Sequence, residues 1–276
     1  TTMTDLVVRR LLIDLETPFP ARWNGGDAFS SAFFNALSMS FPSGEQYFID
    51  CVRAGLKALP PERRDAMAEE VRGFIGQEAT HRRIHALFNA NLQRLGYDNA
   101  IERRTEARRR AHEGDDLRNK VAATAATEHF TAIFANWMLH HPEVLQHAEP
   151  RLRILWQWHS AEESEHRNTA FDLYQAMGGS HEWRVRVFHY ISYVFLYDVL
   201  HQTVRNLWHD GSLFRWRTWR GAWRLLLARD GMIRGNIRLW RDYTSRDFHP
   251  SQHAAELAQP WLRDNADRFT VVGHRA

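Results

Sequence analysis

The chain contains very little cysteine, and this shortage limits how it can be stabilised. Cys51 is the only cysteine in 276 residues, so no intramolecular disulfide is possible. A single cysteine fits a reducing compartment. The first residues also lack the basic start, apolar run and small-residue cleavage site of a secretory signal. We therefore expect a cytoplasmic protein.

Neither one sign of charge nor a long apolar run dominates the chain. The formal net charge is +3 at pH 7, and Lys57 and Lys120 are the only lysines. The arginine-rich run 102–110 alternates with glutamates, which is typical of a solvated helix, so we expect no nucleic-acid partner. The apolar segment 185–208 is interrupted by polar residues such as Asp198, so we expect no transmembrane span.

Proline and glycine positions divide the chain into predicted helices. Hydrophobic residues make up 44% of the chain and charged residues 25%, as in ordinary globular proteins. An interruption or kink is expected at Pro42 and Gly44. Between the other breaks, the predicted long helices span residues 28–59, 62–95, 117–140 and 150–178. The sequence therefore predicts an all-α fold.

These helices predict one four-helix bundle with additions at both ends. Residues 1–27 are expected to form an irregular lead-in, and residues 28–180 the bundle. Residues 181–246 are predicted to be aromatic-rich helices that pack on the bundle. The tail, 247–276, is expected to be irregular and polar, with a short helix near 251–258.

Two Glu-x-x-His steps are the most specific chemical pattern in the sequence. They are Glu78 with His81 and Glu163 with His166, and no other glutamate precedes a histidine by three positions. A carboxylate and an imidazole three residues apart project from the same side of a helix. One such step arises easily by chance, whereas two steps in the same context do not.

A lone glutamate precedes each step at nearly equal spacing. Glu45 lies 33 positions before Glu78, and Glu128 lies 35 positions before Glu163. One glutamate from each of two helices, together with two Glu-x-x-His steps, is the ligand set of a di-iron or di-manganese site in a four-helix bundle. The sequence therefore predicts two bound metal ions, iron first, with manganese or a mixed pair as the alternative. The competing interpretation is that these residues are solvated neighbours on surface helices.

Three further residues leave alternatives open. His85 shares the helix face of the first step, and His159 has the mirror relation to the second step. Both could hydrogen-bond to ligands, or His85 could add a third imidazole to one metal. Glu162 is an alternative ligand to Glu163 because it lies four positions before His166.

Six segments spread over nearly the whole chain carry a family resemblance. They are Phe33–Ser38, Phe41–Glu45, Ile75–His81, Glu128–Thr131, Trp158–His166 and Asp247–Pro250. Together they resemble a bacterial family catalogued as predicted metal-dependent hydrolases. The resemblance implies a ferritin-like four-helix bundle with additional C-terminal helices. By similarity to ferritin-like di-iron enzymes, Glu78 and Glu163 are expected to bridge the metals, with Glu45 and Glu128 as terminal ligands.

Three functions follow from a dimetal site. The main hypothesis is an oxidase or oxygenase that activates dioxygen, receives electrons from a donor and acts on a small, partly apolar substrate. The alternative is hydrolysis by a metal-bridged water, for which zinc would serve. Iron storage is less favoured because the chain continues well beyond the fourth predicted helix.

The aromatic-rich C-terminal helices are expected to cover the bundle and shape an apolar pocket. Their tryptophan stripe, Trp216, Trp219 and Trp223, is surrounded by arginines. We interpret this stripe as core with a solvated rim rather than as a membrane-surface contact. The sequence leaves open whether the chain forms a homodimer.

Overall fold

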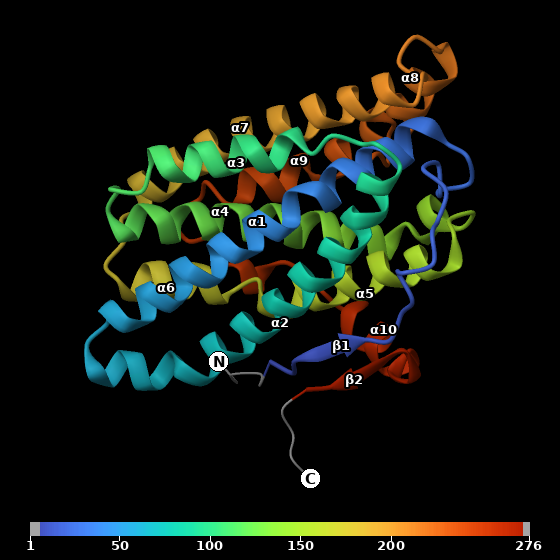
Figure 1. The fold of residues 1–276 in the computed structure, drawn as a ribbon. Helices are drawn as coiled ribbons and strands as arrows, with labels where there is room; N and C mark the ends of the chain where they lie inside the picture. Colours follow the sequence, from blue (N-terminus) through green and yellow to red (C-terminus); the bar gives the residue numbers. More distant parts are fainter. Residues whose placement is uncertain (1–5, 273–276) are drawn as a thin grey trace.

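Helices make up nearly all of the regular structure. The computed structural model describes residues 6–272, and among these only two three-residue strands accompany the helices (Figure 1). The all-α fold class predicted from the sequence is therefore confirmed. No helix within the described part of the chain is long and apolar enough to cross a membrane.

Four helices surround the predicted metal residues. They are α1 (Ala28–Ala58), α2 (Pro61–Arg94), α4 (Leu117–His140) and α5 (Pro150–His166). Helix α1 packs along α2, α4 packs along α5, and α1 also contacts α4 (Figure 1). Asp27 and Asp116 cap the first turns of α1 and α4 by accepting hydrogen bonds from backbone N–H groups.

The predicted fourth helix is two helices. Helix α5 ends at His166, and α6 (Thr169–Ala176) begins after a turn at Arg167 and Asn168. The first part carries the predicted ligands, and the second packs against α4. The prediction of one continuous helix over 150–178 is wrong at this turn.

Helix α1 continues through Pro42 without the predicted interruption. A proline inside a helix lacks the N–H that would bond the carbonyl four residues earlier, here that of Ser38. Asn89 of α2 donates a hydrogen bond from Nδ2 to this carbonyl at 2.9 Å. The free carbonyl therefore has a partner from the neighbouring helix, and α1 remains regular enough to carry Glu45.

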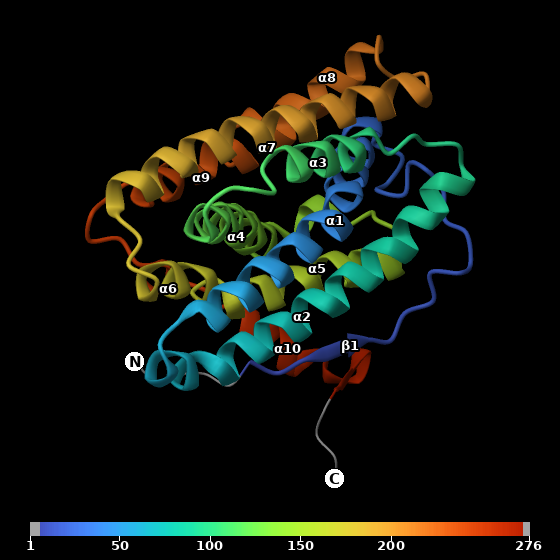
Figure 2. The ribbon, with the colours of Figure 1, turned by 60° about the vertical axis from the view of Figure 1, so that its left-hand side comes forward.

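Four further helices cover one side of the bundle. They are α3 (Ala100–Ala111), α7 (His181–His209), α8 (Trp216–Ala222) and α9 (Met232–Asp242). Helix α7 contacts α1, α3 and α4, and α9 contacts α4 (Figure 2). A short π-helical turn over 223–227 follows α8. The domain boundaries proposed from the sequence stay a prediction.

The tryptophan stripe of α8 and of the π-helical turn that follows it is not part of the core. Trp216 is 65% exposed and Trp223 is 57% exposed, and Trp219 is also exposed. The expectation that these rings form a core stripe is therefore wrong, because α8 lies at the outer end of α7 (Figure 2).

The lead-in and the tail pair with each other. Strand β1 (Arg9–Leu11) lies antiparallel to β2 (Phe269–Val271). Helix α10 (Ala258–Asp264), which precedes β2, packs on α5. The two segments predicted to be irregular thus contain a small sheet. In place of one short helix over 251–258, the structure has a 3-10 turn over Pro250–Gln252 and then α10. Three-residue strands are too short to leave a periodic pattern.

Candidate metal centre

All eight predicted metal-site residues lie together inside the bundle. Helix α1 contributes one of them, α4 one, α2 three and α5 three. Every one is at most 5% exposed. The eight residues are Glu45, Glu78, His81, His85, Glu128, His159, Glu163 and His166.

Their side-chain atoms form two groups that could each hold a cation. In the first, one ligand atom from each of Glu78, His81, Glu163 and His166 lies within 4.8 Å of the others. In the second, Glu45, His81 and His159 meet the same limit. His81 belongs to both groups, so the two positions are adjacent. This arrangement fits a pair of metal ions.

Glu163 is the most central carboxylate. Its Oε1 lies 2.8 Å from His159 Nε2, 3.4 Å from His81 Nδ1 and 3.7 Å from His166 Nε2. Glu128 lies outside both groups, but its Oε2 is 2.9 Å from His166 Nδ1. Glu163 therefore faces both candidate metal positions.

Several buried polar atoms of the cluster have no hydrogen-bond partner among the described residues. Both carboxylate oxygens of Glu45 and Glu78 are of this kind, as are Glu128 Oε1 and Glu163 Oε2. His81 Nδ1 and His166 Nε2 also lack partners. Buried polar atoms without partners are rare because each costs free energy. A cation between them would satisfy them, so the residues fit the implied metals.

Burial and mutual repulsion perturb the carboxylates. Burial, followed by repulsion from Glu128 and Glu163, holds the pKa of Glu78 well above its ordinary value. Burial also raises the pKa of Glu45 strongly. For Glu163 burial acts in the same direction, but the surrounding imidazoles outweigh it and hold its pKa well below the ordinary value. The cluster therefore needs positive charge, which bound cations would supply.

Arg9 and Glu162 orient His81. Glu162 Oε2 accepts a hydrogen bond from His81 Nε2 at 2.9 Å, and Arg9 donates to Glu162 Oε1 at 3.1 Å. With Nε2 held by Glu162, Nδ1 of His81 points toward Glu163. Burial lowers the pKa of His81, but its contacts with Glu162 and Glu163 outweigh burial and raise the pKa to about 10, so a metal ion at Nδ1 would replace a proton there. A carboxylate that holds the second nitrogen is the usual partner of a metal-binding histidine. The geometry therefore favours Glu163 over Glu162 as a ligand.

Sequence reasoning missed Arg9. Its guanidinium is buried at 7% exposure and also contacts Glu165 at 2.7 Å. It lies in β1, far from α5 in sequence and in a segment predicted to be irregular. No motif surrounds it, so only the fold reveals its contact with the cluster.

A chain of hydrogen bonds orients His159. Asn89 Nδ2 must donate to the Ser38 carbonyl, so Asn89 Oδ1 is the acceptor for the Ser38 hydroxyl at 2.8 Å. The hydroxyl proton is then used, and His85 Nδ1 must donate to Ser38 Oγ at 2.9 Å. His85 Nε2 lies 2.7 Å from His159 Nδ1.

The direction of these hydrogen bonds places a lone pair on Nε2 of His159. Burial lowers the pKa of His85 far below its ordinary value, so His85 is neutral and its Nε2 accepts from His159 Nδ1. Burial also lowers the pKa of His159 to about 4, which leaves Nε2 without a proton. That lone pair faces Glu163 Oε1 at 2.8 Å. Two acceptors at this distance call for a cation, so His159 fits a ligand and His85 orients it.

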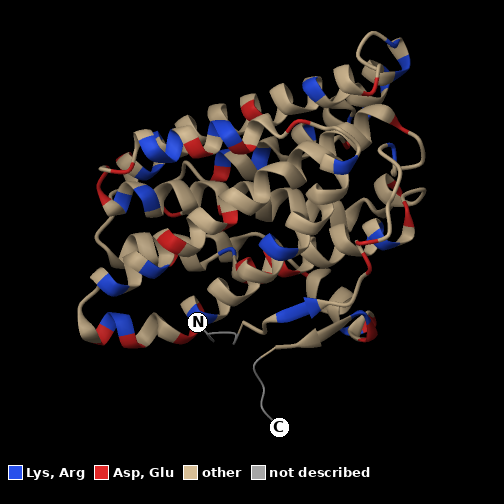
Figure 3. Ribbon diagram, in the orientation of Figure 1, with Lys and Arg blue, Asp and Glu red and all other residues tan. Residues whose placement is uncertain are grey.

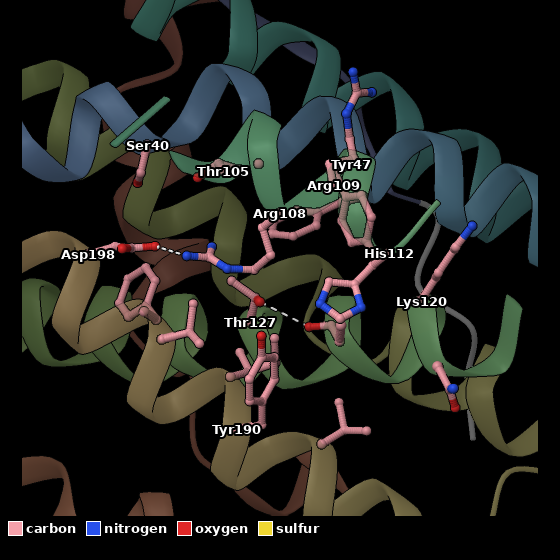
Figure 4. Close-up of a pocket in the computed structure, with 18 of the residues that line it drawn as sticks. Ser40, Tyr47, Thr105, Arg108, Arg109, His112, Lys120, Thr127, Tyr190 and Asp198 are labelled. Atoms are coloured by element: carbon pink, nitrogen blue, oxygen red, sulfur yellow. Dashed lines mark hydrogen bonds and ion pairs between the residues drawn. The ribbon is translucent and has the colours of Figure 1, made fainter. Parts of the chain in front are cut away.

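A pocket of about 500 Å³ reaches the cluster from the side of α3 and α7 (Figure 4). Glu45 is one of its lining residues, together with Phe41 and Phe48 of the same helix. Helices α3, α4 and α7 supply the other walls. The volume lies in the ordinary range of small-molecule sites. The expected apolar pocket is therefore present beside the candidate metal residues.

Comparison with known proteins gives one assignment. No curated protein and no solved structure matches the chain significantly. A family model described as "Predicted metal-dependent hydrolase" matches residues 7–254, a range that includes Arg9, all four bundle helices and the pocket. The buried carboxylate and imidazole cluster agrees with the metal dependence in that description. The chain thus belongs to the family of predicted metal-dependent hydrolases.

Proposed function

We propose that this protein is an enzyme with a dinuclear metal centre held between α1, α2, α4 and α5. The observation that carries the proposal is the set of buried carboxylate oxygens and imidazole nitrogens that face one another and find no hydrogen-bond partner in the described part of the chain. Glu163 and Glu78 are the candidate bridging ligands, and Glu45 and Glu128 the candidate terminal ligands. His81, His159 and His166 would supply the nitrogen ligands.

Hydrolysis is the first candidate reaction. The family description supports it more directly than oxidation. The group of Glu45, His81 and His159 offers one carboxylate and two imidazoles, a combination that also occurs in catalytic zinc sites. When bound, divalent cations would lower the pKa of a coordinated water and polarise the scissile bond.

The surrounding residues of this chain have defined tasks in that reaction. Glu162 and Arg9 hold His81 with Nδ1 toward the centre. His85 holds His159 with Nε2 toward Glu163. Glu45 separates the centre from the pocket, so a substrate in the pocket meets the centre at this carboxylate.

Oxidation with dioxygen is the second candidate. Two Glu-x-x-His steps with two lone glutamates from separate helices are typical of di-iron carboxylate proteins. Two histidines with one carboxylate also form the iron site of non-haem oxygenases. This reaction would require iron, dioxygen and an electron donor, and the apolar pocket suits a substrate with few polar groups.

Two assays on one preparation separate these reactions. The protein would be freed of metal and reloaded with zinc, manganese or ferrous iron, and bound metal would be measured per chain. Anaerobic cleavage of an acyl ester by the zinc or manganese form, abolished in Glu163→Ala, would support hydrolysis. Dioxygen consumption by the reduced iron form without ester cleavage would support oxidation instead. Failure to bind any metal would overturn both.

A further inference from the structure

The pocket beside Glu45 has apolar walls although its lining includes hydroxyl groups. Ser40, Thr127 and Thr131 each donate a hydrogen bond to a carbonyl of their own helix, at 2.7, 2.9 and 3.0 Å. These hydroxyls are therefore occupied and present mainly carbon to the pocket. The remaining walls are largely aromatic and aliphatic, including Phe41, Phe48, Ile101, Ile191, Val194 and Phe195.

The buried end and the open end of the pocket differ in polarity. At the buried end lies Glu45, which is 2% exposed. At the open end lie polar side chains with access to solvent, among them His112 at 49% and Arg109 at 43% side-chain exposure. Figure 4 shows His112 and Lys120 on this side of the pocket, with Arg108 directed at Asp198 and Arg109 pointing away from the pocket. The pocket thus connects a charged rim to the metal residues through an apolar interior.

The rim carries an excess of positive charge. Outside the buried end, the lining holds the basic side chains of Arg108, Arg109, Lys120 and Arg186 and the carboxylates of Asp115 and Asp198. Asp198 is shared by Arg104 at 2.7 Å and Arg108 at 2.6 Å, and Arg109 pairs with Glu106 at 3.1 Å. Lys120 donates to a backbone carbonyl and has no carboxylate partner among the described residues. Arginines also gather along α3, which forms this side of the pocket (Figure 3). A negatively charged group at the rim would therefore be attracted.

We propose that the pocket binds an anionic amphiphile, a molecule with an acidic group at one end and an apolar chain or ring system at the other. The acidic group lies at the rim, near Lys120 and Arg186, two lining residues for which the described residues supply no carboxylate partner. The apolar part fills the interior and reaches Glu45. The proposal rests on the proposed function only in taking Glu45 as part of the metal centre, and it holds for either candidate reaction.

Binding of simple amphiphiles tests this proposal. The probes are dodecanoate, dodecanol and dodecylammonium, which share a chain and differ in the charge of the head group. Affinities would be measured by calorimetry below the micelle-forming concentrations, on the metal-free full-length chain. Dodecanoate is expected to bind about three- to tenfold more tightly than dodecanol, since partly exposed charges contribute modestly. Dodecylammonium is expected to bind most weakly.

Matched variants locate the site. Ile191→Trp should fill the pocket and weaken dodecanoate and dodecanol by at least about tenfold, whereas Leu200→Trp, on the exposed outer face of α7, should change neither. Val194→Phe provides a second blocked pocket if Ile191→Trp lowers the melting temperature. The double variant Lys120→Gln/Arg186→Gln should weaken dodecanoate and leave dodecanol unchanged. Arg103→Gln, an exposed arginine outside the pocket, is its control.

The outcomes separate this proposal from the proposed function. Equal affinity for all three probes, or affinity unchanged by both blocked pockets, would overturn the amphiphile site while leaving the metal centre untouched. Preferential binding of dodecanoate by a chain that takes up no metal would support the amphiphile site and overturn the dinuclear centre. Metal content, measured on every variant, distinguishes the two.

Discussion

The two sides of the carboxylate cluster are built on opposite principles. On the side of the small sheet, the buried charges of Arg9 and Glu162 are paired with each other. Arg9 bonds Glu162 and Glu165, and Gln77 and Gln259 also donate to Glu165 at 2.7 Å. On the side of α3 and α7, the pocket is mainly apolar, and neither oxygen of Glu45 has a hydrogen-bond partner within residues 6–272.

This difference assigns the orientation of the ligands to one side of the cluster and the entry of a substrate to the other. A buried ion pair is stable only when hydrogen bonds satisfy both partners, so the sheet side is held in one geometry. That geometry is transmitted to His81 through Glu162. On the pocket side, the buried ion pairs of Asp198 with Arg104 and Arg108 lie at the rim, and the pocket leaves space next to Glu45. The fixed side therefore orients ligands, and the open side admits a substrate.

The largest expected effect comes from the residue that both sides share. Glu163→Ala should remove both metal ions, because Glu163 faces three imidazoles that belong to the two candidate positions. The measurement is metal per chain by elemental analysis after loading and desalting. Glu69→Ala, an exposed glutamate on α2, is the control and should retain the wild-type content. Two full metal equivalents in Glu163→Ala would show that the two positions do not depend on this carboxylate.

The next largest effect is expected on the fixed side. Arg9→Ala would leave Glu162 buried without its cation, which typically costs about 3–5 kcal/mol of unfolding free energy. Metal affinity should fall about 10- to 100-fold because His81 loses its orientation. Urea unfolding of the metal-free chain and a metal titration would measure the two effects.

Arg10→Ala is the matched control for Arg9→Ala. Arg10 lies in the same strand, but its side chain is exposed. Its removal should change neither unfolding free energy nor metal affinity by a measurable amount. Equal effects of the two substitutions would mean that the strand matters and the contact of Arg9 with Glu162 does not.

Two serines of α1 sharpen the comparison on a smaller scale. Ser38 belongs to the hydrogen-bond chain that ends at His159, whereas Ser40 lines the pocket and bonds only its own helix. Ser38→Ala should cost about 1–2 kcal/mol of stability and weaken metal binding up to about tenfold. Ser40→Ala should leave metal affinity unchanged. Identical metal titrations for both variants would show that the hydrogen bonds from Ser38 through His85 to His159 do not affect metal binding.

The sequence predicts the candidate ligand residues better than the residues that hold them in position. The four ligand helices follow from proline and glycine breaks, and the Glu-x-x-His steps follow from helical geometry at three-residue spacing. Local helical periodicity was sufficient to predict that these residues share a helix face. The structure brings all of them together, including His85 and His159, whose helix faces the sequence also predicts.

The residues that hold the ligands in position do so through contacts that no local sequence pattern encodes. Pro42 indicates a broken helix, and only Asn89, on another helix, supplies the donor that keeps α1 continuous. Arg9 lies in a strand of three residues whose partner strand is at the other end of the chain. Such contacts join segments far apart in sequence, so they become visible only once the fold is known.

The smallest effect tests a histidine that lies next to a predicted ligand but faces away from the cluster. His129 follows Glu128, and its Nε2 donates to the carbonyl of Leu239 at 3.0 Å. Burial, followed by the nearby His253, lowers its pKa to about 3. In the unfolded chain the ordinary value of 6.5 applies, so below pH 6.5 the unfolded state binds the extra proton and stability falls with pH.

His129→Gln should remove this dependence. The glutamine amide can still donate a hydrogen bond but does not titrate in this range. Between pH 6.5 and 5.5, the metal-free wild type should lose about 1 kcal/mol of unfolding free energy relative to the variant. Urea unfolding of both chains across this range measures the difference, and the protonation of Glu128 contributes to both and largely cancels. Parallel curves would mean that His129 accepts a proton inside the fold, so its surroundings would be more polar than its contacts with Tyr243 and Phe248 indicate.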